Sequence, residues 1–472
     1  MIFSSLLLIL GACTKDISRF NVDTKHASSV TAETLFSNAV RNVVDGITTP
    51  NVNDNVFRFT VQHWGMTTYE DEANYDFTTR AIPERWWGRM YRDVLSDLNE
   101  SARLVNEDSK LSEITKANQL AMIDIMQVYT FQILVNTFGN IPYSESLDVE
   151  KLFPKYEDAK TVYSDLFTRL AADITSLNTT GGGFASQQDL VGKGSVSKWI
   201  LFANSLQVRM AMTIADDDNA KAKTLFEAAD SKAISKISGE DIIFKYLGSS
   251  PNTNPIWNDI VQSGRQDYIA ANTLIDFLKA NSDPRLPLYF QPNSDGVYVG
   301  DTVGKVTTFS SVAKPAVKIS APDFPSVLFD YSEMEFYRAE AKERGYTVSG
   351  TAESHYNNAI RASILSWGGT DADATTYLAN PSVAYTTATG NWKQKIGTQK
   401  WIALYNRPFL GWTELRRLDY PVLKLPYEAK SGFPNRFPYP GNEQQLNGTN
   451  YTAAAAAMGG DKVEFKLFWD KF

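Results

Sequence analysis

The sequence predicts a mainly α-helical protein in which about four tetratricopeptide-like helix pairs carry an irregular, loop-rich side with minor β-structure. Three observations support this fold class. Apolar side chains recur at three- and four-residue steps over much of the chain, as on one face of a helix. The helical segments come in consecutive pairs joined by short loops. Pro, Gly, Asn and Asp break the helical period in residues 239–325 and 421–472.

Composition is that of a protein with a large core and no nucleic-acid partner. Of the 472 residues, 43% are hydrophobic and 21% are charged, which is typical of a globular chain that needs no disulfides. The net charge is −8 and no basic block occurs, so we expect no contact with a phosphate backbone. The 10 Trp and 22 Tyr also provide many flat side chains for a binding surface.

The N-terminus predicts a lipid anchor. Residues 2–12 are apolar or small, and a helix of this length, about 16 Å, is too short to span a bilayer core. The run is typical of a signal-peptide apolar region, although no Lys or Arg precedes it. It ends in Leu-Gly-Ala-Cys, which resembles the bacterial lipobox, and Cys13 is the only cysteine. We therefore expect a signal peptide over residues 1–12 and lipidation of the Cys13 sulfur; a free cysteine near the terminus is the alternative.

The body of the chain is expected to form one globular domain over residues 31–472, behind a polar, lipidated tether at 13–30. A helix is predicted from Pro83 through Leu104, because proline favours the first helical turn. Helix pairs are then predicted within 111–238 and 326–420. Their expected ranges are 120–138 with 157–177, 195–215 with 220–237, 328–344 with 352–366, and 394–405 with 411–418.

The two irregular segments differ from these pairs. Within 239–325 a helical pattern remains only at Tyr268–Leu278, and short strands are predicted at Val297–Val299 and Val303–Phe309. The segment 421–472 is expected to be an irregular layer throughout.

An ordered set of sequence motifs runs through most of the chain. The motifs are TFGNIPYSES (137–146), VSKWILFANSLQVRMAMTI (196–214), DPRLPLYF (283–290), SEMEFYRAEAKERG (332–345), TQKWIALY (398–405) with ELRRLDYP (414–421), NRFPYPGNEQQLNGTNYTAA (435–454) and GGDKVEFKLFWDKF (459–472). In this order they resemble the motifs of the SusD/RagB-like nutrient-binding outer-membrane lipoproteins of Bacteroidetes. Phe468 stands where a second Trp is common in that family.

The resemblance implies four tetratricopeptide-like helix pairs, with the ligand site on the less regular side. It also implies a position on the cell surface, anchored in the outer membrane by lipid, above a SusC-like TonB-dependent transporter. The implied activity is the capture of oligosaccharides, or of peptides, without catalysis. Two other classes stay open, a surface-anchored glycoside hydrolase on a helical scaffold and a structural or adhesive lipoprotein.

Two stretches carry candidate ligand contacts, because sugar recognition needs flat aromatic faces beside hydrogen-bonding groups. The first, residues 61–77, has no helical or alternating period. It offers Trp64, Tyr69 and Tyr75 for stacking, with His63 and the polar side chains Gln62, Glu70, Asp71 and Asn74 nearby. The adjacent pair Trp86–Trp87 opens a helix, so at most one of the two faces the core; Trp86 is included as a candidate contact.

The second stretch, residues 254–268, lies in the irregular segment. Trp257 could stack on a sugar, and Asn258, Arg265 and Asp267 could bond hydroxyl groups; Arg265 could instead bridge loop carbonyls. Asn293, Asp295 and Gly296 faintly resemble a calcium loop but fit a β-turn better. The remaining large aromatics on helical stripes are predicted to be core: Trp199, Trp367, Trp401 and Trp412.

Catalytic and cofactor motifs are missing from the sequence. It contains no G-x-S-x-G, H-E-x-x-H or phosphate loop, and its three histidines are scattered. We therefore expect no catalytic residue, no metal and no cofactor. A pair of carboxylates for glycoside hydrolysis is the one enzymatic alternative, since the 54 acidic residues offer many pairs whose spacing the sequence does not reveal.

Overall fold

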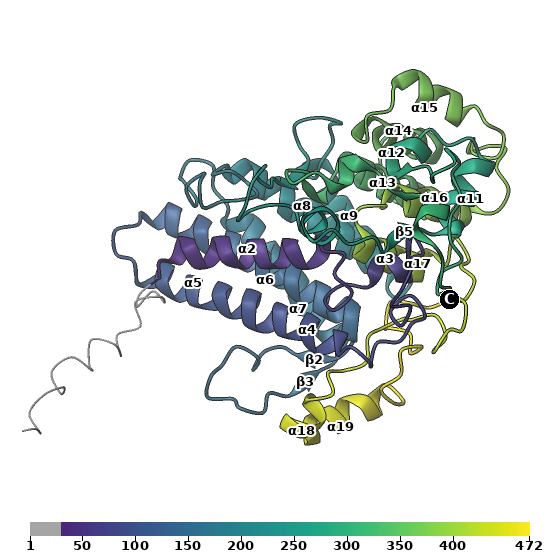
Figure 1. Ribbon diagram of the computed structural model, residues 1–472. Coiled ribbons are helices and arrows are strands. Elements are labelled where there is room, and N and C mark those ends of the chain that lie inside the picture. The colour runs from purple at the N-terminus through teal and green to yellow at the C-terminus, as the bar shows by residue number, and fades with distance from the viewer. Residues whose placement is uncertain (1–29) are drawn as a thin grey trace, which may run out of the picture.

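The computed structural model describes residues 30–472 and shows a mainly helical protein (Figure 1). The predicted signal peptide, Cys13 and most of the predicted tether lie outside the described residues. Among residues 30–472, no helix has the length and apolar character needed to cross a bilayer.

All four predicted helix pairs are present, and the two helices of each pair contact one another. Side chains at the N-termini explain where many of these helices begin, because Ser195, Asp330, Thr351 and Asn391 each accept a hydrogen bond from a backbone N–H of the first turn. The pairs are α6 (Glu113–Phe138) with α7 (Ala159–Ser176), α8 (Val196–Thr213) with α9 (Asn219–Ala229), α13 (Tyr331–Glu343) with α14 (Ala352–Ser366), and α16 (Trp392–Ala403) with α17 (Pro408–Leu418).

A further helical layer covers the first pair. Helix α2 (Ala32–Thr48) and helix α5 (Ser96–Glu107) lie alongside α6 (Figure 1). The helix predicted from Pro83 is one run made of α4 (Ile82–Gly88), the π-helical turn η1 (Arg89–Leu95) and α5. Two shorter helices, α3 (Phe57–Thr60) and α15 (Asp371–Leu378), complete the frame.

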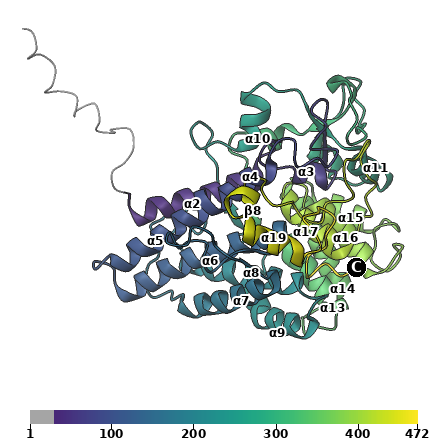
Figure 2. The ribbon, with the colours of Figure 1, turned by 90° about the horizontal axis from the view of Figure 1, so that it is seen from below.

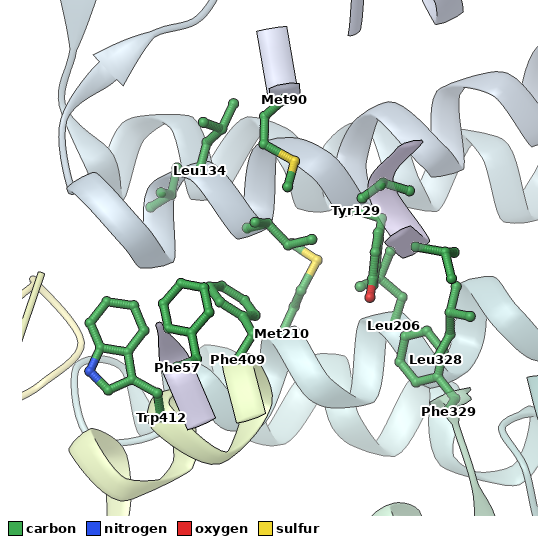
Figure 3. Close-up of a cluster of buried hydrophobic side chains, with 14 of the residues drawn as sticks. Phe57, Met90, Tyr129, Leu134, Leu206, Met210, Leu328, Phe329, Phe409 and Trp412 are labelled. Atoms are coloured by element: carbon green, nitrogen blue, oxygen red, sulfur yellow. The ribbon is translucent and has the colours of Figure 1, made fainter. Parts of the chain in front are cut away.

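The core joins the helical layers through large apolar side chains. Figure 3 shows Phe57, Phe409 and Trp412 packed together beside Met210 of α8, and the Phe57 ring lies 5.1 Å from the rings of Phe409 and Trp412. The prediction that four tryptophans are core is confirmed, because Trp199, Trp367, Trp401 and Trp412 are all at most 8% exposed. Burial of each such side chain stabilises the fold by roughly 1.5–3 kcal/mol.

Residues 30–472 form four two-stranded antiparallel sheets: one lies in the connection between α6 and α7, and the other three include strands of the loop-rich side. Figure 2 shows the helices α10 (Pro255–Trp257) and α11 (Asn272–Ala280) of the loop-rich side, away from α9 and α13. The sheets are β1 (Trp64–Met66) with β5 (Tyr268–Ala270), β2 (Ile141–Pro142) with β3 (Tyr156–Glu157), β4 (Ile242–Phe244) with β8 (Ser326–Phe329), and β6 (Phe290–Gln291) with β7 (Lys314–Pro315).

Two local predictions for the irregular segments are wrong, and a third is confirmed only in part. Residues Val297–Val299 and Val303–Phe309 form no strand, because their backbone groups bond in turns and single contacts, such as Ala313 N–H to Val299 O at 2.7 Å. The helix predicted at Tyr268–Leu278 begins as strand β5 and becomes α11 only at Asn272. The connections in this region also hold short helical turns: η3 (Asn258–Gln262), α12 (Leu286–Tyr289), η4 (Phe309–Ser311) and η5 (Val317–Ser320).

The C-terminal segment is more ordered than predicted. It forms α18 (Glu443–Leu446) and α19 (Gly448–Ala457), in which a run of alanines favours the helix. Two asparagines of this region, Asn447 and Asn450, donate side-chain hydrogen bonds to the carbonyls of Pro154 and Phe153 in the loop between β2 and β3. The tail is therefore packed onto the helical frame.

Candidate functional site

The two stretches predicted to contact ligand lie side by side. Strand β1 pairs with β5 so that Trp64 stands opposite Ala270 and Met66 opposite Tyr268. The pairing continues one residue further, where Thr67 N–H donates to the carbonyl of Asp267 at 2.9 Å. The first stretch is thus joined to the second by backbone hydrogen bonds between β1 and β5.

Two of the three aromatic side chains predicted to stack in the first stretch, Trp64 and Tyr75, are buried, which corrects their predicted role. Trp64 has no exposed surface; its Nε1–H donates to the Tyr405 hydroxyl at 2.9 Å, and the Arg58 guanidinium lies 4.6 Å from its ring centroid. Tyr75 is 2% exposed, and its hydroxyl donates to Thr60 O and accepts from Gln62. Neither ring has a free face on which a sugar could stack.

Trp86 needs the same correction. It is fully buried, and its Nε1–H donates to Thr137 Oγ1 at 3.2 Å. Its neighbour Trp87 is half-buried, with the rings of Tyr91 and Phe138 at 4.8 and 4.9 Å. The Trp86–Trp87 pair is therefore part of the packing between α4 and α6.

The polar members of the first stretch divide into buried and exposed groups. His63 is fully buried, and burial, followed by the nearby Arg58 cation, lowers its pKa to about 3, so it is neutral. Asn74 is buried, whereas Glu70 and Asp71 are partly exposed. Tyr69 is 54% exposed and lies 5.2 Å under the Arg80 guanidinium. Of the predicted stacking residues in this stretch, Tyr69 is the one that keeps an accessible ring.

The second stretch lines a cavity on the loop-rich side. The cavity has a volume of about 390 Å³, and we call it the Trp257 cavity. Its walls come from α10, η3, β5, β6, η4, β7 and η5, all within residues 255–322. The lining residues are Trp257, Ile260, Val261, Arg265, Tyr268, Gln291, Phe309, Lys314, Pro315, Val317, Ser320, Ala321 and Pro322.

Local structure places Trp257 at the cavity wall. Asn254 caps the short helix α10, because its Oδ1 accepts from Ile256 N–H at 2.7 Å and Pro255 follows at the first helical position. Trp257 is consequently half-buried and lines the cavity. The predicted contact Asn258 is exposed and is not part of the lining; its Oδ1 accepts from the Thr253 hydroxyl at 2.8 Å.

Arg265 and Asp267 form an ion pair at the cavity. The Arg265 Nε and Nη2 atoms donate to Asp267 Oδ2 at 2.9 and 2.6 Å, and the guanidinium lies 5.2 Å from the Tyr268 ring centroid. Arg265 lines the cavity, whereas Asp267 is 7% exposed and lies behind it. The Asp267 carboxylate therefore orients Arg265, and the remaining Arg265 N–H groups are donors for a ligand.

Sequence reasoning missed Tyr268, Phe309 and Lys314. Tyr268 is 2% exposed and lines the cavity, yet its hydroxyl has no hydrogen-bond partner. Burial, with nearby carboxylates such as Asp259, raises its pKa, so the hydroxyl stays a neutral donor. Lys314 Nζ lies 4.8 Å from the Phe309 ring centroid. No periodic pattern marks these residues, because they come from separate short elements.

The cavity can bind a ligand that has both apolar faces and hydroxyl groups. Trp257, Phe309, the Tyr268 ring and the prolines supply apolar walls, while Arg265 and Lys314 supply donors. Among residues 30–472, no group of three or more His, Cys, Asp or Glu side chains could hold a metal ion. Asn293 to Gly296 form a turn, with Gly296 N–H donating to Asn293 O at 3.1 Å.

A frame of helix pairs thus carries this cavity on its loop-rich side. Residues 24–440 match the model of the SusD-like family, described as starch-binding and associating with the outer membrane. The chain belongs to this family. No curated protein matches the sequence.

Solved structures of similar fold include two chitin-binding proteins. A chitin-binding protein is 24% identical, with a TM-score of 0.81, over 94% of this chain and 100% of its own. A chitin-binding SusD homologue from Flavobacterium johnsoniae is 22% identical, with a TM-score of 0.79, over 92% and 98%. A SusD homologue from Bacteroides uniformis is 24% identical, with a TM-score of 0.78, over 93% and 99%. These similarities establish the fold.

Proposed function

We propose that the protein binds a nutrient oligosaccharide in the Trp257 cavity at the cell surface and delivers it, without catalysis, to a SusC-like TonB-dependent transporter. One observation carries the proposal: the cavity wall combines the aromatic residues Trp257, Phe309 and Tyr268 with the cations of Arg265 and Lys314. Aromatic faces beside hydrogen-bond donors are what a sugar needs for stacking and for bonding its hydroxyl groups.

The family and its relatives support a glycan as the ligand. The family is described as starch-binding, and two proteins of the same fold are described as chitin-binding. Stacking of sugar rings on Trp257 or Phe309 fits these glycans. A peptide is the alternative ligand.

Anchoring at the outer membrane completes the proposal. The family is described as associating with that membrane. Lipidation of Cys13 would hold the protein there, because two or more acyl chains give stable attachment. The polar residues up to 30 would then act as the tether.

A binding panel tests the proposed function. The full chain, purified in detergent, is titrated calorimetrically with chito-oligosaccharides, malto-oligosaccharides and short peptides, and each mixture is analysed for cleavage products. We expect binding of one glycan series without product. Product formation would support a hydrolase, and binding of peptides alone would contradict the glycan assignment.

A substitution in the cavity identifies the site. Trp257→Ala should weaken glycan binding by roughly 1–3 kcal/mol, because an aromatic anchor is lost. Trp392→Ala is the matched control, since Trp392 is also half-buried but lies in α16, outside the cavity. Unchanged affinity in a folded Trp257→Ala protein would remove this cavity as the binding site.

A further inference from the structure

A second hollow lies beside the Trp257 cavity, and none of the sequence-predicted contacts is part of it. Two spaces of about 290 and 260 Å³ share Asp241, Asp330, Ser332 and Ser366 in their walls. Because these four residues line both spaces, we treat the two as one hollow and call it the Asp241 groove. Ile237 lines the first space and Trp367 lines the second.

Strand pairing brings two carboxylates together in this groove. Ile242 of β4 stands opposite Phe329 of β8, so Asp241 and Asp330 lie at the same end of this two-stranded sheet. Asp330 is neutralised by Arg407, whose Nη2 lies 2.9 Å from its Oδ1. Asp241 accepts from Tyr331 N–H at 3.1 Å and forms no ion pair with any described residue. Burial, and then the charge of Asp330, raises the pKa of Asp241 to about 6.

The rest of the wall supplies aromatic surface, hydroxyls and donors. The rings of Phe324 and Trp367 lie 5.6 Å apart and both line the groove. Ser366 is exposed and lines both halves. Lys318 Nζ, which donates to the Trp367 carbonyl at 2.8 Å, provides a cation in the same space. Acceptors, donors and a flat apolar wall in one hollow are the groups that bind a neutral, hydroxyl-rich ligand.

The groove and the Trp257 cavity share one dividing wall. Val317, Ser320 and Pro322 line the Trp257 cavity, while Lys318, Phe324 and Pro325 line the groove. The backbone from residue 320 to residue 324 can extend over at most about 14 Å. A linear oligosaccharide of a few units is long enough to pass from one hollow to the other.

We propose that the Asp241 groove is a second saccharide subsite, which binds a further part of the same oligosaccharide chain held in the Trp257 cavity. The inference rests on the proposed function and adds the ligand class: a linear, neutral oligosaccharide long enough to occupy both hollows. Once one part of the oligosaccharide is bound in the Trp257 cavity, the remaining part meets the Asp241 groove at a high effective concentration. Affinity should therefore rise with the length of the oligosaccharide, even though a single sugar unit would bind the groove weakly.

A chain-length series tests the groove. The full chain in detergent is titrated with chito-oligosaccharides and malto-oligosaccharides of two to six units. For the series that binds, wild-type affinity should rise roughly tenfold or more from the shortest to the longest ligand. In Ser366→Trp, whose indole fills the groove, this rise should disappear while the affinity for the shortest ligand stays that of wild type.

Two further variants keep the test decisive. Asp241→Asn removes the charge but keeps the side-chain shape, and should reduce the rise severalfold without unfolding the protein. Thr376→Trp places an indole on an exposed position of α15 outside the groove and should behave as wild type. The inference is contradicted if affinity still rises with ligand length in both Ser366→Trp and Asp241→Asn, or if wild-type affinity does not depend on ligand length. In either case, binding of the shortest ligand would still support the proposed function. A third outcome would also contradict the second subsite: Trp257→Ala loses binding of the shortest ligand, while Ser366→Trp and Asp241→Asn bind every ligand as wild type does. The Trp257 cavity would then remain as the binding site.

Discussion

At the residue scale, the site and the core use buried polar groups in opposite ways. The Tyr268 hydroxyl is buried without a partner beside the cavity, whereas Glu340 in α13 is fully buried and bonded to two arginines. An orphaned donor destabilises the unliganded fold, and a paired carboxylate stabilises it. Substitution of each residue should therefore change stability in a different direction.

Tyr268→Phe should separate stability from binding. Removal of a hydroxyl that has no partner should leave the free energy of unfolding unchanged or raise it by up to about 1 kcal/mol. The same change should leave glycan affinity unchanged, because the hydroxyl has no accessible surface in the cavity. Urea denaturation and calorimetric titration of the same preparation measure both effects. A destabilised protein with normal affinity would show that the hydroxyl serves the fold.

Glu340→Gln should destabilise the protein by about 3 kcal/mol, because two buried arginines lose one carboxylate and keep only Glu414 and Asp216 as carboxylate partners among residues 30–472. Glu340 accepts from Arg417 Nη1 and Nη2 at 2.5 Å and from Arg344 Nε at 2.7 Å. Burial alone would raise the pKa of Glu340, but the Arg417 and Arg344 cations outweigh it and hold the pKa at about 2. Urea denaturation of the variant at neutral pH measures the loss.

The same pair predicts a pH dependence. Because the folded pKa of Glu340 lies below the unfolded value of 4.5, the unfolded chain binds more protons between pH 4.5 and 2. The contribution of Glu340, about 3 kcal/mol by this shift, is complete above pH 4.5 and is lost as the pH falls to 2. The pH profile of Glu340→Gln should be flatter there than that of wild type. Glu107→Gln, an exposed change, should keep the wild-type profile.

At the element scale, one carboxylate organises the loop that leads into α8. Asp189 is fully buried; its Oδ1 accepts from Gly192 N–H at 2.7 Å and its Oδ2 from Gly194 N–H at 2.9 Å and Trp199 Nε1–H at 2.9 Å. These bonds fix the entry to the second helix pair.

Asp189→Ala should lower the free energy of unfolding by at least about 3 kcal/mol, because several buried donors lose their acceptor. Asp189→Asn keeps one oxygen and should lose about half as much. Denaturant unfolding of both variants measures the difference. Equal stability of Asp189→Ala and wild type would show that water replaces the carboxylate without loss.

The sequence predicted the helix pairs because each helix buries one face, and that face repeats every 3.6 residues. It did not predict the loop-rich side, where strands of two to four residues pair with partners as far apart as β1 and β5. Trp64 was expected at the surface for that reason, since the pairing that buries it lies about two hundred residues away. Trp257 and Arg265 were found because aromatic and cationic side chains cluster there in sequence, whereas Lys314 and Phe309 reach the cavity only through the fold.

At the scale of the whole molecule, attachment to the membrane and ligand binding are expected to be separable. The described residues contain the cavity and the core, and the predicted anchor at Cys13 precedes them. Residues 14–29 are mostly polar, and as the predicted tether they would contribute length rather than packing.

Cys13→Ala should release the protein from the membrane fraction while glycan affinity stays that of wild type. The physical reason is the loss of the acyl chains, whose burial contributes roughly 0.8 kcal/mol for each CH₂. Fractionation of cells, with mass spectrometry of the native chain, measures attachment and acylation. A chain that stays at the membrane without acylation would contradict the lipid anchor.

The segment from Val317 to Pro325 has a consequence for how such a protein can diversify. Because some residues of this stretch line one hollow and others line the second, an insertion or deletion there would reshape both at once. Sugar specificity and the preferred length of the oligosaccharide would then change together. Exchange of this single stretch between homologues should therefore alter both properties in one step.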